Sequence, residues 1–228
     1  MSTIADNIAQ VSSRIHAAAV AAQRDEHSVQ LLAVSKTKPA EALREAYAAG
    51  ILDFGENYLQ EALGKQLELA DLPLIWHFIG PIQSNKTRAI AEHFAWVHSV
   101  DRLKIAQRLS EQRPADLPPL NLCIQVNVSG EASKSGCTPA DLPALANAIS
   151  ELPRIKLRGL MAIPEPTEDR AAQDAAFAAV RNLQASLNLP LDTLSMGMSH
   201  DLESAIAQGA TWVRIGTALF GARDYGQS

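Results

Sequence analysis

The chain has 228 residues, of which 47% are hydrophobic and 20% charged, and its formal net charge is −5. This composition is typical of a globular protein with enough apolar material for a sizeable core, and the acidic balance argues against a general binder of nucleic acid or anionic membranes. No run approaches the ~20 apolar residues that span a bilayer, and the first ten residues lack the apolar stretch of a secretory signal. Two cysteines, Cys123 and Cys137, have no close spacing and are expected to be reduced, which predicts a cytoplasmic protein.

The first predicted element is a helix within residues 1–27. Ile4, Ile8, Val11 and Ile15 recur at the spacing of one helical face. Because no strand precedes this helix, we expect it to pack as an extra element on the rest of the fold.

A buried strand is predicted next, because the apolar run 31–34 leads into Ser35 and Lys36 and is closed by Pro39. Lys36 then lies where the strand leaves the core. Partial burial lowers the pKa of a lysine, which is the condition for a lysine that forms a Schiff base with an aldehyde or ketone. The alternative is a strand-end lysine that extends its ammonium into water.

Seven more strands are predicted, and helices separate them. The strands are expected at 51–57, 74–80, 95–100, 120–128, 155–163, 191–196 and 211–215, and the helices at 39–50, 58–70, 84–94, after Asp101, and at 139–152, 168–186 and 199–208. Alternation of strand and helix indicates parallel strands with crossover helices. Eight strands predict an α/β fold in which residues 1–228 form a single (β/α)8 TIM-type barrel with an extra N-terminal helix; a doubly wound open sheet is the alternative.

Two loops at the carboxyl ends of predicted strands have the composition of an anion site. Residues 195–201 bend at a glycine, and residues 214–221 offer a glycine followed by a threonine. Barrels often bind phosphate between the loops after strands seven and eight, although each glycine alone could mark an ordinary turn. Strands one and eight are neighbours in a barrel, so a small molecule with both an aldehyde and a phosphate would bridge Lys36 and these loops. Pyridoxal phosphate fits this description.

Five segments of the chain carry a resemblance to a known family. They are Ala33–Pro39 (AVSKTKP), Phe54–Tyr58 (FGENY), His77–Lys86 (HFIGPIQSNK), Arg158–Pro164 (RGLMAIP) and Ser195–Ser199 (SMGMS). Together they resemble the signatures of the YggS/PROSC family of pyridoxal phosphate homeostasis proteins, which are similar to the N-terminal barrel of alanine racemase. The resemblance covers nearly the whole chain.

The resemblance implies roles for particular residues toward pyridoxal 5'-phosphate. It implies that Lys36 carries the internal aldimine and that Asn57 lines the ring. It further implies that Arg214 faces the pyridine nitrogen and that the phosphate is held by Ser199, Gly216 and Thr217. A guanidinium has only donors and stays charged, so its partner nitrogen must be unprotonated, and such a ring is a weak electron sink.

We therefore expect a cofactor-binding and delivery protein in intracellular pyridoxal phosphate homeostasis rather than an enzyme, with no catalytic residue and no metal site. No residue is an evident base on the opposite face of the cofactor. His77 and His200 are expected to be structural or at the surface, Tyr47 and Tyr58 fall on or beside early helices, and Tyr225 is near the terminus. The alternatives are a low-activity pyridoxal phosphate enzyme of the amino-acid racemase type, a class I aldolase-like barrel without cofactor, and a pure scaffold.

The expected partners are pyridoxal phosphate and, transiently, apo forms of enzymes that use it; the protein is expected to be a monomer that binds neither nucleic acid nor membrane. The small polar segment 130–136 is a candidate mobile lid. Lys38 and Lys134 are candidate secondary aldehyde-binding lysines, although solvated lysines are the simpler interpretation.

Overall fold

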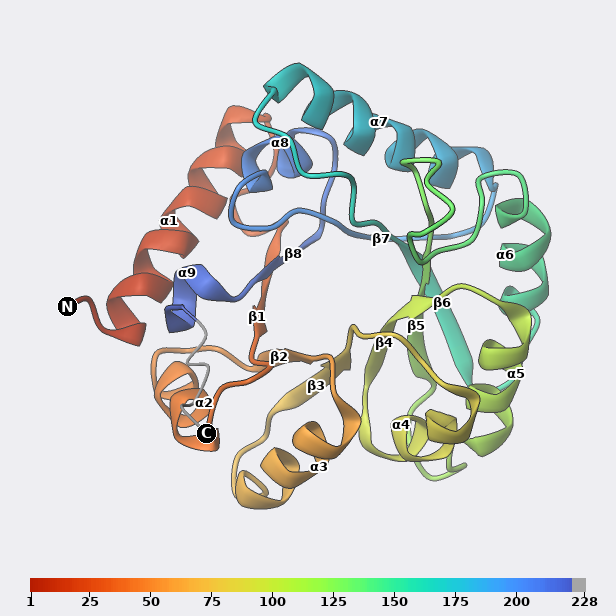
Figure 1. Ribbon diagram of the computed structural model, residues 1–228, viewed down its shortest axis with the longest axis horizontal. Helices are drawn as coiled ribbons and strands as arrows, with labels where there is room; N and C mark the ends of the chain where they lie inside the picture. The colour runs from red at the N-terminus through yellow and green to blue at the C-terminus, as the bar shows by residue number, and fades with distance from the viewer. Residues whose placement is uncertain (223–228) are drawn as a thin grey trace.

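The computed structural model describes residues 1–222, which fold around a closed barrel of eight parallel strands (Figure 1). The strands follow one another around the barrel in chain order, and β8 pairs with β1 to close it. They are β1 (Gln30–Val34), β2 (Asp53–Glu56), β3 (Ile75–Phe78), β4 (Trp96–Val100), β5 (Leu120–Gln125), β6 (Ile155–Met161), β7 (Thr193–Ser195) and β8 (Trp212–Ile215). The predicted (β/α)8 barrel is confirmed, and each strand lies within or against its predicted range.

The helices form a ring outside the barrel (Figure 1). They are α1 (Ile4–Ala21), α2 (Ala40–Ala48), α3 (Leu59–Glu68), α4 (Thr87–His93, after a short 3-10 turn at Ser84–Lys86), α5 (Leu103–Gln112), α6 (Leu142–Ser150), α7 (Arg170–Ser186), α8 (Leu202–Ala207) and α9 (Thr217–Phe220). Within residues 1–222, no helix is long and apolar enough to cross a membrane.

The extra N-terminal helix α1 packs beside α2, α8 and α9 (Figure 1). Its start is fixed by a capping box, in which the Thr3 side chain accepts from the Asp6 N–H and the Asp6 carboxylate accepts from the Thr3 N–H. The helix is shorter than the predicted segment 1–27, because the chain turns after Ala21 and Gln23 adopts a left-handed φ of 58°. Its apolar face is buried as expected from the spacing of its isoleucines and valine.

Large side chains fill the barrel interior. Leu32, Trp96, Cys123, Met161 and Trp212 form a buried cluster there, separate from the larger core between strands and helices. Trp96 and Trp212 are the first residues of β4 and β8, so the interior is packed rather than open toward the amino ends of the strands.

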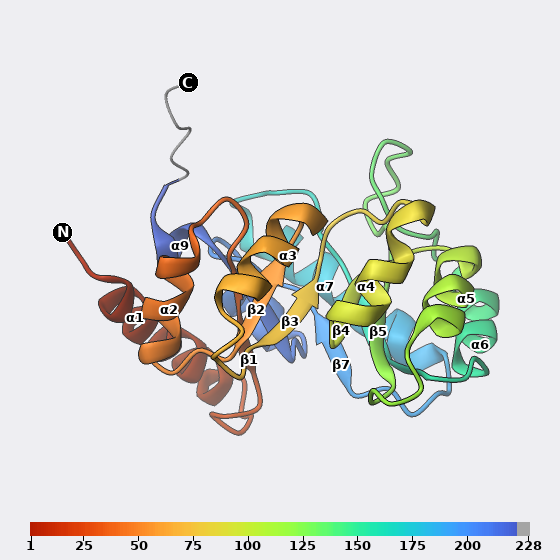
Figure 2. The ribbon, with the colours of Figure 1, turned by 90° about the horizontal axis from the view of Figure 1, so that it is seen from below.

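The opposite end of the barrel, toward which the strands point, carries the longer loops. Figure 2 shows the segment between β5 and α6, which includes the predicted lid, rising above the barrel on this side. In that segment Lys134 lies 3.8 Å from Glu131, and the Asn127 side chain donates to the Glu131 carbonyl at 2.7 Å. These contacts give the segment a defined turn, and its role as a lid stays a prediction.

Candidate functional site

A cavity of about 480 Å³ opens at the carboxyl ends of the strands. Its walls come from the ends of β1, β2, β3, β6, β7 and β8, and they comprise Val34, Lys36, Asn57, Ile79, Ile163, Met198, Ser199, His200, Arg214, Gly216, Thr217 and Ala218. All six site residues predicted from the sequence are among them. The prediction that the first strand and the last two strands contribute to one pocket therefore agrees with the geometry.

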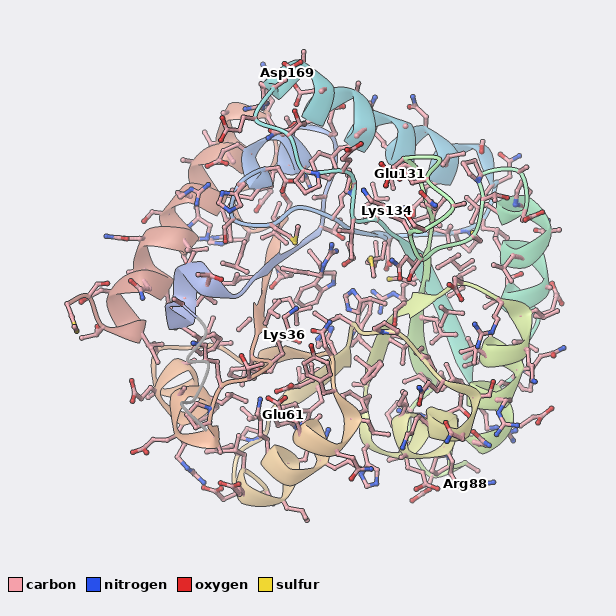
Figure 3. All side chains as sticks on the ribbon, viewed as in Figure 1. Lys36, Glu61, Arg88, Glu131, Lys134 and Asp169 are labelled. Atoms are coloured by element: carbon pink, nitrogen blue, oxygen red, sulfur yellow. The ribbon has the colours of Figure 1, made fainter. Side chains whose placement is uncertain are left out.

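Lys36 is held at the cavity by a constrained turn. It is half-buried, follows the buried Ser35, and lies within the ring of strands (Figure 3). The next residue, Thr37, has a φ of 65°, which is rare for a β-branched residue and costs about 1–3 kcal/mol. The Glu61 carboxylate accepts from the Thr37 N–H at 2.6 Å and holds this conformation. Strain of this kind is concentrated at functional sites, and here it fixes the direction in which Lys36 leaves the strand.

A buried ionic cluster lies beneath this turn. The Lys65 ammonium, 6% exposed, donates to the Glu56 carboxylate and to the Ser35 carbonyl at 2.6 Å each, and it lies 2.7 Å from the Glu61 carboxylate. The Ser35 hydroxyl donates to the same Glu56 oxygen at 2.8 Å. Burial raises the pKa of Glu56, while Lys65 opposes that shift. Sequence reasoning missed this cluster, although the i, i+4 spacing of Glu61 and Lys65 on one helix was a usable signal.

Asn57 extends from the end of β2 into the same cavity. Its Oδ1 atom is shielded from solvent and has no hydrogen-bond partner among residues 1–222. A buried amide oxygen is normally paired. The Asn57 amide therefore has hydrogen-bonding capacity left for a group that enters the cavity.

The loop after β7 forms one side of the cavity. Gly197 turns the chain with a φ of 100°, and Ser199 follows it at the cavity wall. Arg14 of α1 fastens this loop: it donates to the Ser199 carbonyl at 2.9 Å and makes a paired contact with the Glu203 carboxylate at 2.9 and 3.0 Å. Ser199 was expected to begin the next helix, but α8 begins at Leu202 and Ser199 lies in the preceding turn.

The loop after β8 forms the adjacent side. A Cβ built on Gly216 would lie 3.3 Å from the Val34 carbonyl oxygen, so glycine allows the chain to pass close to the end of β1. Thr217 follows at the cavity wall, and the Leu219 carbonyl accepts a hydrogen bond at 2.9 Å from the Asn7 side chain of α1. The extra helix therefore fastens both loops, a role that the sequence did not indicate.

Arg214 lies on β8 at the floor of the cavity and is 5% exposed. Its Nη1 donates to the Ser195 hydroxyl at 2.8 Å and its Nη2 to the Ala162 carbonyl at 3.0 Å. Burial lowers the pKa of Arg214 to about 10, with Asp201 opposing the shift, so the guanidinium remains charged at neutral pH. A guanidinium has five N–H donors, so Arg214 can also donate to a group in the cavity.

Two of the other side chains singled out from the sequence lie away from the cavity wall, and a third belongs to it. His77 is buried inside the barrel and hydrogen-bonded to Asp53 and His98, whereas His200 is an exposed residue of the cavity wall. Lys38 donates to the Ala222 carbonyl at 2.8 Å.

Two tyrosines also lie outside the cavity wall. Tyr58 is exposed at the start of α3, and Tyr47 is half-buried on α2. Tyr225 lies outside the described residues.

Comparison with known proteins gives a consistent set of relatives. The pyridoxal phosphate homeostasis protein of Pseudomonas aeruginosa is 79% identical over 226 residues, which cover 99% of this chain and 98% of the relative. The protein of the same name from Escherichia coli is 55% identical over 99% of both chains. PipY of Synechococcus elongatus, solved with pyridoxal phosphate bound, is 45% identical, with a TM-score of 0.85 over 96% of this chain and 100% of that one.

More distant structures share the barrel. Alanine racemase of Corynebacterium glutamicum has a TM-score of 0.67 at 17% identity and is matched over 62% of its length, a likeness of fold. The sequence profile of the alanine racemase N-terminal domain family matches residues 2–224. The chain belongs to this family and, within it, to the pyridoxal phosphate homeostasis proteins of the YggS/PROSC type.

Proposed function

We propose that this protein binds pyridoxal 5'-phosphate in the cavity and takes part in its intracellular homeostasis and delivery without a defined catalytic reaction. The observation that carries the proposal is the meeting of a half-buried lysine and two small polar loops in one cavity at the carboxyl ends of the strands. Full-length relatives named for this role, and a relative solved with this cofactor, support it.

The residues present fit the cofactor. A cavity of about 480 Å³ lies within the range of small-molecule sites, and Val34, Ile79, Ile163 and Met198 supply apolar walls for an aromatic ring. The Asn57 amide has unused hydrogen-bonding capacity for a ring substituent. In our proposal the backbone and hydroxyl groups of the phosphate loops hold the phosphate through Ser199, Gly216 and Thr217.

Lys36 is the residue that we propose to bond covalently. Its Nζ would attack the aldehyde carbon, form a C=N bond, and release the aldehyde oxygen as water. The bond is reversible by addition of water, so the same residue could capture and release the cofactor. When bound, the cofactor supplies a carbonyl carbon that exchanges between amines and a ring that withdraws electrons.

Arg214 is the residue that favours binding over catalysis. We propose that it donates to the pyridine nitrogen, because it stays charged and offers only donors. A nitrogen that accepts this bond is held unprotonated, which weakens the ring as an electron sink.

We further propose that the protein is a monomer that binds apo-enzymes transiently. We also propose that it acts in the cytoplasm, where its two buried free cysteines would stay reduced.

The proposal is tested by visible absorbance of the purified protein titrated with pyridoxal phosphate. We expect wild type and the neighbouring-lysine control Lys38→Ala to develop the same visible band, and Lys36→Ala to develop none. Loss of the band on addition of an apo-enzyme, with recovery of that enzyme's activity, would support delivery. A colourless wild type, or a Lys36→Ala variant with an unchanged band, contradicts the proposal.

A further inference from the structure

A continuous network of hydrogen-bonded polar side chains, buried except at Asp53, runs through the barrel from Arg214. The Arg214 Nη1 donates to Ser195 Oγ at 2.8 Å, and Ser195 Oγ lies 2.8 Å from His98 Nδ1. His98 Nε2 lies 2.9 Å from His77 Nδ1, and His77 Nε2 lies 2.8 Å from the Asp53 carboxylate. This network of side chains crosses from β8 to β7, β4, β3 and β2. It ends at Asp53, the first residue of β2, at the opposite end of the barrel.

The acceptor at Asp53 and the neutral state of the two histidines fix the direction of the bonds in this network. Asp53 as a carboxylate can only accept, so His77 donates to it from Nε2. A neutral His77 then accepts at Nδ1 from His98 Nε2, and a neutral His98 accepts at Nδ1 from the Ser195 hydroxyl. Arg214 can only donate, so Ser195 Oγ accepts from it. The hydrogens of the network therefore all point away from the cavity.

The surroundings of the histidines favour this neutral form. Both are fully buried, and burial lowers the pKa of each; His77 and Arg214 add to the effect on His98. Two indole rings enclose His77: Trp96 stacks on it with ring centres 5.4 Å apart, and Trp212 meets it edge-on at 4.9 Å. These contacts hold the imidazole plane in line with its two partners.

We propose that Ser195, His98, His77 and Asp53 are positioning residues for Arg214, which hold its guanidinium in the orientation that binds the cofactor ring. This inference rests on the proposed function. Bonds aligned in one direction polarise and strengthen one another. Asp53 holds the proton of His77 on Nε2, and through the two histidines it keeps the Ser195 hydrogen directed at His98, so that an Oγ lone pair faces Arg214. Loss of the acceptor at Asp53 leaves this direction undetermined.

Asp53, at the end of the hydrogen-bond network furthest from Arg214, gives the cleanest test. Asp53 does not line the cofactor cavity; its side chain is 21% exposed and borders a separate cavity at the amino end of the barrel. In Asp53→Asn the amide oxygen can still accept from His77, whereas Asp53→Ala removes the acceptor. A contribution to stability alone would not alter the light absorption of a cofactor bound at the other end.

The experiment measures the affinity for pyridoxal phosphate and the position of the visible band in wild type, Asp53→Ala, Asp53→Asn and Ser195→Ala. The control is Asp71→Ala, which removes an exposed acid that pairs with Arg44. We expect Ser195→Ala to bind about tenfold more weakly. Asp53→Ala should bind several-fold more weakly, with a displaced band in both variants. Asp53→Asn should recover most of the affinity and the wild-type band, and the control should match wild type.

The outcomes separate the two proposals. If wild type fails to bind the cofactor, the proposed function is wrong. If wild type binds and Asp53→Ala matches Asp53→Asn in both affinity and band position, the proposal that these residues position Arg214 is wrong. Thermal unfolding of each variant identifies any that do not fold, and the two Asp53 variants decide the question even if Ser195→Ala is lost.

Discussion

The buried ionic cluster beneath Lys36 makes a sharp prediction about stability. In Lys65→Met the ammonium is lost, while the Glu56 carboxylate stays fully buried within the fold. Removing one partner of a buried ion pair costs about 3–5 kcal/mol, because the remaining charge has no compensation. For a domain of this size each kcal/mol lowers the melting temperature by about 2–4 °C, so we expect a decrease of roughly 6–20 °C.

A second substitution isolates the cause. Glu56→Gln removes the uncompensated charge and keeps an oxygen that can accept from the Ser35 hydroxyl. We therefore expect the double variant Lys65→Met/Glu56→Gln to be more stable than Lys65→Met by about 2 kcal/mol or more, measured by urea unfolding in a double-mutant cycle. Lys104→Met, at an exposed lysine on α5, is the matched control and should stay within about 0.5 kcal/mol of wild type.

The same cluster predicts a pH dependence. Burial raises the pKa of Glu56 in the folded protein, and Lys65 opposes this shift. A carboxyl group with a raised folded pKa favours folding in its protonated form, so its contribution is lost as the pH rises toward and through that value. Without Lys65 the pKa rises further, and the deficit of Lys65→Met should grow from acidic to neutral pH. A deficit below about 1 kcal/mol at neutral pH, or one that shrinks as the pH rises, would refute the reasoning.

Two further predictions concern the loops and the thiols. Arg14→Ala removes the contacts with Glu203 and the Ser199 carbonyl, so we expect about fivefold weaker binding of pyridoxal phosphate. Binding of pyridoxal, which lacks the phosphate, should be unchanged, and equal losses for both compounds would contradict a role of Arg14 in the phosphate loop. Burial raises the pKa of Cys123 to about 12 and that of Cys137 to about 11. A thiol reagent at pH 8 should therefore label neither cysteine in the native protein and both after denaturation, and rapid labelling of the native protein would contradict this.

The sequence was sufficient for the barrel and for the residues at its carboxyl end. Each strand is a short apolar run bounded by polar residues or a breaker, and helices separate the runs, so parallel order followed from the alternation. In a closed barrel the first and last strands are neighbours, so the order of the strands alone predicts that Lys36 and Arg214 lie at one cavity. The position of a residue along its strand was enough for these predictions.

The features that the sequence did not reveal depend on side-chain direction and on contacts between distant segments. His98 and Ser195 are 97 positions apart, and nothing in the local pattern of β4 or β7 indicates that they meet inside the barrel. Arg14 looks like an ordinary polar residue on an amphipathic helix until α1 is docked against the loop after β7. The predicted start of α8 at Ser199 was wrong because Asp201 folds back to accept from the Met198 N–H at 2.7 Å and closes a turn before the helix.

The central claim is that Lys36 holds the cofactor, and trapping the bond tests it most directly. The protein is incubated with pyridoxal phosphate, the C=N bond is reduced with borohydride, and proteolytic peptides are analysed by mass spectrometry. We expect the reduced cofactor on the peptide that contains Lys36, at close to one per chain, with little on Lys38 or Lys134. Modification mainly at either of those two lysines, or of no lysine in a protein that has turned yellow, would contradict the account.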